Sequence, residues 1–140
     1  MIGKSSKVDN RVKQVLDGIG LKYTTVSDGD FRLIFDMGGG RSQVIFIRSS
    51  TNTYRNLEIR DVYSPAYESD GAIPANIANR LLEHNWAIKL GGWAKLGKYA
   101  VFMSKVDADA DKEAMMSCIV LTAKAADEME AELTGKQDKF

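Results

Sequence analysis

Residues 31–47 read FRLIFDMGGGRSQVIFI, a pattern that predicts a β-hairpin. From Phe31 to Met37 every second residue is a large apolar one, which is the period of a strand. Gly38–Gly40 then interrupt the chain, and Val44–Ile47 form a continuous apolar run. Because a connection this short joins antiparallel strands, the stretch predicts an antiparallel sheet.

Two further strands are expected on either side of this hairpin. Leu21–Val26 precedes it across an Asp-Gly turn at residues 27–30, and Leu57–Tyr63 follows it after a polar loop at residues 49–53. Pro65 is expected to end the last strand, because proline cannot donate a hydrogen bond to its neighbour. The four strands and their short connections predict a meander.

The first of three predicted helices precedes the meander. Its apolar stripe begins at Val8 and recurs at helical spacing, with Ser6 as the expected N-cap and Gly18 or Gly20 at the end.

A second helix, two strands and a third helix are predicted after the meander. Pro74 suits the first turn of the second helix. An irregular strand from Trp86 and a regular one over Tyr99–Val106 follow. Aspartates at residues 107–111 suit the start of the last helix, which is expected to run to about Leu133. The order is therefore α-β-β-β-β-α-β-β-α, an α+β fold with helices packed on an antiparallel sheet.

Length and composition indicate one cytoplasmic domain. The 140 residues fit a single domain, and nineteen basic against nineteen acidic residues argue against a nucleic-acid partner. Cys118 is the single cysteine, which favours a reducing compartment. The N-terminal residues lack the apolar core of a signal peptide, and no apolar run approaches the roughly 20 residues that span a bilayer. We therefore expect no membrane partner.

No motif predicts a catalytic, metal or cofactor site. Gly38–Gly40 are followed by a strand instead of the helix that a phosphate loop needs. The aspartates at residues 107–111 lack the glycine and glutamate of a calcium loop, where Lys112 and Cys118 stand. His84 has no assignable partner residue for catalysis or for zinc.

The third strand presents apolar residues to both faces of the sheet. Val44 and Phe46 point to one face, Ile45 and Ile47 to the other, and Ile34 and Val62 are expected to add to the second face. Either a helix of the chain or a partner covers that second face. The three available helices favour cover by the chain itself.

Residues 81–106 carry a resemblance to a known family. They read Leu81-Leu82-Glu83-His84-Asn85-Trp86, then Leu90-Gly91-Gly92-Trp93, then Tyr99-Ala100-Val101-Phe102-Met103. This resembles the YbjN family and the wider group with a type III secretion chaperone-like fold, over roughly residues 7–133, which is also the expected ordered core of the single domain at residues 1–140. The resemblance implies a two-layer sandwich with a curved sheet, often dimeric, that binds proteins or regulates them.

The leading hypothesis is a non-enzymatic protein-binding, adaptor or chaperone-like module that is dimeric. Its partner-binding residues are predicted to be Ile34, Val62 and Trp93, with either a protein partner or a second copy on the apolar sheet face. The alternative is a small-molecule-binding or enzymatic domain with a pocket between sheet and helices. The side chains expected to converge in that pocket are Tyr63, Tyr67, Arg80 and His84. A third hypothesis is a structural subunit of a larger assembly.

Overall fold

A computed structural model describes residues 7–135 and 138–140. Within them the chain forms three helices and seven strands. In chain order these are α1 (Asn10–Ile19), β1 (Thr24–Thr25), β2 (Phe31–Gly38), β3 (Arg41–Ile47), β4 (Asn52–Tyr54), β5 (Leu57–Glu68), α2 (Ala75–Ala87), β6 (Gly92–Leu96), β7 (Tyr99–Asp107) and α3 (Lys112–Thr134). The α+β fold and the predicted order are confirmed, and the polar loop expected at residues 49–53 contributes part of an additional short strand, β4.

All strand pairs are antiparallel, in the order β1-β2-β3-β5-β7-β6, with β4 paired to β5 alone. The β2–β3 hairpin turns at Gly39 and Gly40, whose φ angles are 60° and 80°. Positive φ at both central residues suits a two-residue hairpin turn, which explains the glycines without a phosphate site.

β5 continues through Pro65 to Glu68, so the prediction that Pro65 ends this strand is wrong. The register of β5 against β7 shifts between Pro65 and Tyr67. On its other side β5 pairs with β3 only at Phe46–Tyr63 and Ile47–Val62. Pro65 therefore lies at a bulge on the β7 side of β5 and opposite no paired residue on the β3 side. Its lack of an N–H group costs the sheet no hydrogen bond there.

The sheet divides where β3 and β5 separate. The Gln43 amide bridges the opening, because its Nε2 donates to Ser64 Oγ at 2.8 Å and to the Pro65 carbonyl at 2.7 Å. Ser64 Oγ in turn donates to the Val44 carbonyl at 2.5 Å. These bonds satisfy polar groups that the lost ladder would otherwise leave unpaired.

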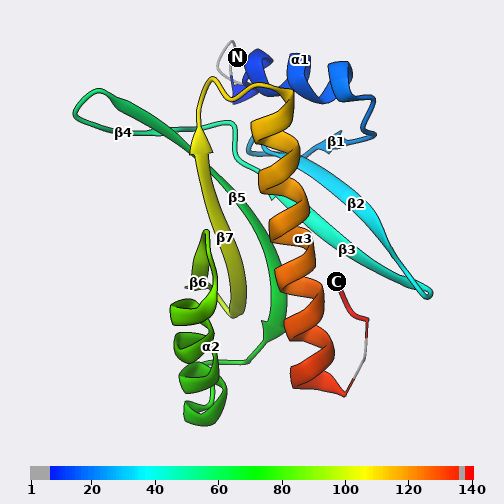
Figure 1. Cartoon of the computed structure of the whole chain (residues 1–140), viewed down its shortest axis with the longest axis vertical. Helices are drawn as coiled ribbons and strands as arrows, with labels where there is room; N and C mark the ends of the chain where they lie inside the picture. The colour runs from blue at the N-terminus through cyan, green and yellow to red at the C-terminus, as the bar shows by residue number, and fades with distance from the viewer. Residues whose placement is uncertain (1–6, 136–137) are drawn as a thin grey trace.

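The three helices pack on the same face of the sheet. α3 crosses the sheet lengthwise, α1 lies at one end of α3 and α2 lies beside β6 (Figure 1). One buried cluster joins α1 and α3 to β2, β3 and β5, and a second joins α2 and α3 to β5 and β7. The architecture therefore has two layers, and the helices leave the opposite face of the sheet uncovered.

Aspartates cap two of the helices. α1 begins after Asp9, whose side chain accepts from the Arg11 N–H, whereas the predicted cap Ser6 lies outside the described residues. Asp111 caps α3 by accepting from the Ala114 N–H at 2.9 Å, which supports the helix-capping interpretation of this acidic segment. None of the helices in the described part of the chain is long and apolar enough to cross a membrane.

Candidate functional site

Strand register assigns the predicted surface residues to different faces. Val62 pairs with Ile47 and is 0% exposed in the core between sheet and helices. Ile34 pairs with Val44 and is 60% exposed. Ile45 lies in the core between sheet and helices, so its neighbour Val44 points away from the helices. Directly opposed residues share a face, and Ile34 therefore lies on the same side as Val44. The prediction that Ile34 and Val62 share one face is therefore wrong, and Val62 is a core residue.

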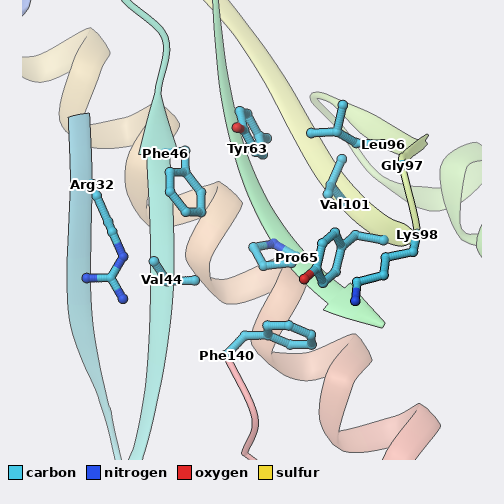
Figure 2. A pocket seen from close by; sticks show the side chains of 11 residues that line it. Arg32, Val44, Phe46, Tyr63, Pro65, Leu96, Gly97, Lys98, Val101 and Phe140 are labelled. Carbon is cyan, nitrogen blue, oxygen red and sulfur yellow. The ribbon is translucent and has the colours of Figure 1, made fainter. Parts of the chain in front are cut away.

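We call the face that carries Ile34 the outer face. Besides Ile34 it carries Arg32, Val44, Phe46, Tyr63, Pro65 and Val101. In close view the helices lie behind the strands and these side chains stand in front (Figure 2). The second face of the prediction, with Ile45 and Ile47, is covered by the chain's own helices as expected, whereas the first face, with Val44 and Phe46, has no helix of the described chain over it.

A cavity of about 580 Å³ lies on the outer face. Its walls come from β2, β3, β5 and β7, from the β6–β7 turn, and from the separate segment that ends in Phe140 (Figure 2). Apolar groups dominate the lining, including Val44, Pro65, Leu96 and Val101. A hollow of this size and character is typical of a binding site.

Two stacked aromatic rings form one wall of the cavity. The rings of Phe46 and Tyr63 have centroids 5.3 Å apart and planes inclined by 21°. Burial raises the pKa of the Tyr63 hydroxyl, and the nearby carboxylate of Asp30 raises it further. The hydroxyl therefore stays protonated at neutral pH and remains a hydrogen-bond donor.

Residues 138–140 close one end of the cavity. The Glu130 carboxylate, which is completely buried on α3, accepts from the backbone N–H of Lys139 at 2.6 Å and of Phe140 at 3.2 Å. Burial raises the pKa of Glu130, and these two hydrogen bonds oppose the rise. The Phe140 ring then meets Tyr99 edge to face, with centroids 6.0 Å apart. A residue far along the sequence thus becomes part of the outer face.

The charged groups around the cavity differ in their partners. Lys98 forms an ion pair with Glu68 at 2.7 Å, and Lys139 contacts the same carboxylate. Arg32 forms no ion pair or side-chain hydrogen bond with any residue in 7–135 or 138–140. A second hollow of about 300 Å³ shares Arg32, Val44 and Phe140 with the cavity and extends to Ile34. Arg32 therefore lies between two adjoining hollows.

Trp93 connects β6 to α2 inside the chain. Its indole N–H donates to His84 Nδ1 at 2.8 Å, and its ring meets Phe102 edge to face at 5.3 Å. These contacts use the indole N–H and part of the ring that a partner would otherwise contact. The structure thus shows intramolecular contacts for Trp93 and His84, and partner binding by Trp93 stays a prediction.

The four side chains expected to form a pocket between sheet and helices do not converge. Tyr63 faces the outer cavity, whereas Tyr67 packs against the cluster that joins α2 and α3 to β5 and β7. His84 bonds to Trp93 on the same helical side. Arg80 forms an exposed ion pair with Glu132 of α3 at 2.6 Å.

A group of three carboxylates lies around Arg41 of β3. Asp127, Glu130 and Asp138 come within 4.8 Å of one another. The Arg41 guanidinium lies 2.9 Å, 3.5 Å and 3.9 Å from their oxygens, respectively. Arg41 thus supplies the positive charge that the carboxylates require, and the group carries no metal assignment.

A second apolar surface lies on α2. Trp86 is 94% exposed, and Leu82 one turn before it and Leu90 just after the helix are exposed as well. This surface borders a separate hollow of about 370 Å³, which Leu82 lines together with Leu81 and Trp93. It is the natural comparison for any test of the outer face.

Sequence reasoning missed Arg32, Phe46 and Phe140 as members of the site. The alternation in β2 did mark Arg32 and Ile34 as neighbours on one face. The register that brings them beside Val44 and Phe46 depends on the turn, and no local pattern points from Phe140 to the sheet.

No protein-family model and no curated protein matches this chain. The resemblance to the YbjN family therefore stays a prediction.

Proposed function

We propose that this chain is a non-enzymatic binding module whose outer face receives an apolar segment of a protein partner. The observation that carries the proposal is the cavity of about 580 Å³ on the face that no helix of the described chain covers. An apolar concavity of this kind is where the anchoring side chains of an interface are buried.

Two properties of the outer face support a protein segment as the occupant. The cavity continues past Arg32 into the second hollow and reaches the exposed Ile34, so the depression is elongated. Exposed apolar side chains beside a pocket add area that a partner removes from water.

Affinity capture from cell lysate with variants of matched chemistry tests this proposal. Ile34→Asp places a charge on the outer face, and we expect it to reduce the bound partner at least about tenfold, as loss of a hot-spot residue does. Leu82→Asp makes the same kind of change at a similarly exposed residue of α2 and should leave capture unchanged. Equal capture by wild type and Ile34→Asp would contradict the proposal.

Self-association is a second form of the same proposal, with another copy of the chain as the protein partner. Sedimentation equilibrium should then show a dimer for the wild-type chain and a monomer for Ile34→Asp. A wild-type monomer at high concentration would leave only a different protein as the partner.

The volume of the cavity also supports the alternative, a small-molecule site, because ligand pockets commonly measure about 300–1,000 Å³. A ligand that binds the folded state raises the melting temperature by mass action. A rise for one member of a metabolite panel, absent in a Phe46→Ala variant, would support this alternative. A flat panel would count against it.

A further inference from the structure

We infer that the segment bound on the outer face carries an acidic side chain beside its apolar residues, and that Arg32 binds this carboxylate. The inference rests on the proposed function and specifies the chemistry of the partner. It begins from the position of Arg32 on β2, directly opposite Phe46 of β3. The guanidinium therefore belongs to the same wall as the stacked aromatic rings (Figure 2).

Arg32 is the one cation around the cavity that lacks a counter-charge among the described residues. Lys98 and Lys139 both contact Glu68. Lys105, farther along β7, forms an ion pair with Asp61 at 2.7 Å. Each of these neighbouring cations thus contacts a carboxylate of the chain, whereas the Arg32 guanidinium contacts none among the described residues and is free for an external group.

The carboxylate that lines the second hollow beside Arg32 has other partners within the chain. Asp138 lines the second hollow together with Arg32. One oxygen of Asp138 accepts from the Ser42 N–H at 3.2 Å, and the other lies 3.9 Å from Arg41. Both oxygens of Asp138 therefore have other partners, and Asp138 does not pair with Arg32.

A carboxylate fits this position better than the other anions that proteins recognise. The planar guanidinium can bind both oxygens of a carboxylate, and apolar surroundings strengthen such a pair relative to one in water. A nucleic-acid backbone would need several free cations in a row, whereas the outer face offers a single one in the described chain. A compact organic acid would fill the main cavity alone and leave the second hollow empty.

The geometry also predicts the spacing within the bound segment. Directly opposed residues on neighbouring strands have Cβ atoms about 5 Å apart. An extended segment advances about 3.3 Å per residue. An acidic residue should therefore lie about one to three positions from the apolar residue that enters the cavity.

Peptide display provides the test without a known partner. Random twelve-residue peptides on phage would be selected on the full chain, and the enriched peptides measured by fluorescence anisotropy against wild type, Arg32→Gln, Arg55→Gln and Phe46→Ala. Arg55 is the matched control, because it is an exposed arginine at the β4–β5 turn without a side-chain partner in the described residues. We expect enrichment of Asp or Glu beside large apolar residues.

The affinities separate this inference from the proposed function. Arg32→Gln should weaken binding about tenfold, the usual size of a lost charge-assisted hydrogen bond, while Arg55→Gln changes it less than about twofold. Replacing the peptide's acid by its amide should cost a similar factor for wild type and nothing for Arg32→Gln. Peptides that lose affinity for Phe46→Ala but bind Arg32→Gln as well as wild type would overturn the inference and leave the proposed function standing. Peptides that bind Phe46→Ala unchanged, or no enrichment, would overturn both.

Discussion

Arg60 is the largest charged side chain in the core, with 0% exposure. Its guanidinium pairs with Asp9 at 2.7 Å and donates to the carbonyl oxygens of Arg48 at 2.8 Å, Ser49 at 2.9 Å and Ala108 at 3.1 Å. Because these groups come from the segments before α1, after β3 and after β7, one buried charge joins three loops at the end of the sheet. A buried charge is tolerated only while its partners remain.

Removing the charge of Asp9 should therefore destabilise the fold. We expect Asp9→Asn to lower the free energy of unfolding by about 3 kcal/mol, since it leaves the Arg60 guanidinium buried without a counter-charge. Urea titration followed by circular dichroism measures this change. Asp17→Asn, which removes an exposed partner of Lys13, is the control and should leave the urea midpoint nearly unchanged.

The same pair predicts how stability depends on pH. Burial alone would raise the pKa of Asp9, but hydrogen bonds from Arg11 and Arg60 outweigh it and hold the pKa well below the usual range. A depressed pKa in the folded state contributes stability above the unfolded value of about 4, and this contribution is lost as pH falls below it. The gap between wild type and Asp9→Asn should thus be full at pH 6 and shrink steadily below pH 4. A gap that stays constant to pH 2 would contradict the assignment.

Cys118 should react slowly in the folded protein. Burial raises the pKa of its thiol to about 11. At pH 8 the thiolate fraction should be about a hundredfold lower than in the unfolded chain, and the thiolate is the reactive form. Labelling with a chromogenic disulfide should be at least that much slower without urea than with it. Rapid labelling of the native chain would show that α3 does not bury this residue as described.

At the scale of the element, β6 depends on a glycine at its start. Gly91 has a φ of 78°, and an added Cβ would lie 2.6 Å from the Met103 carbonyl oxygen and 2.9 Å from the Phe102 ring. Gly97, in the β6–β7 turn, has a φ of 61° and open space around the same position. Alanine at Gly97 would meet backbone strain alone, whereas alanine at Gly91 would meet the same strain together with steric overlap.

We expect Gly91→Ala to destabilise the chain by about 3 kcal/mol and Gly97→Ala by about 1 kcal/mol. The difference reflects the close approach of Gly91 to β7, because both substitutions share the left-handed backbone. Thermal and urea unfolding of the two variants would measure it. Equal losses would mean that β6 does not pack on β7 as closely as the structure indicates.

The elements were largely predictable from sequence, and their faces were not. Alternation shows which residues of one strand share a face, as it does for Arg32 and Ile34. The register between strands decides which residues of different strands join them, and a shift by one residue reverses the assignment. Ile34 faces Val44 because of the Gly39–Gly40 turn, whereas Val62 faces the helices. The prediction that Pro65 ends β5 failed for a similar reason. The separation of β3 from β5 beside Pro65 arises from tertiary packing, which the local sequence does not show.

At the scale of the whole molecule, the outer face and the core should respond differently to the same substitution. Val62→Asp buries an unpaired charge and should lower the free energy of unfolding by about 4 kcal/mol or more. Ile34→Asp changes an exposed residue and should cost about 1 kcal/mol or less. Differential scanning calorimetry would compare them. Loss of the cooperative transition in Ile34→Asp would show that the outer face is part of the core.

The membership of the site illustrates what sequence cannot supply at this scale. The apolar character of β3 on both sides was visible, and it indicated that something must cover a second face. All three helices pack on one face, whereas Phe140 bonds to Glu130 of α3 and lines the cavity on the other face. Both features depend on packing between segments far apart in the sequence.

Photo-cross-linking in cells tests whether the outer face is the binding surface. The chain would carry p-benzoylphenylalanine at residue 34 on the outer face or at residue 82 on α2, two positions of similar exposure. We predict a discrete cross-linked species from residue 34 that disappears when Arg32→Gln and Phe46→Ala are introduced together, and none from residue 82. A cross-linked partner from residue 82 with none from residue 34 would exclude the outer face as the binding surface and assign binding to α2.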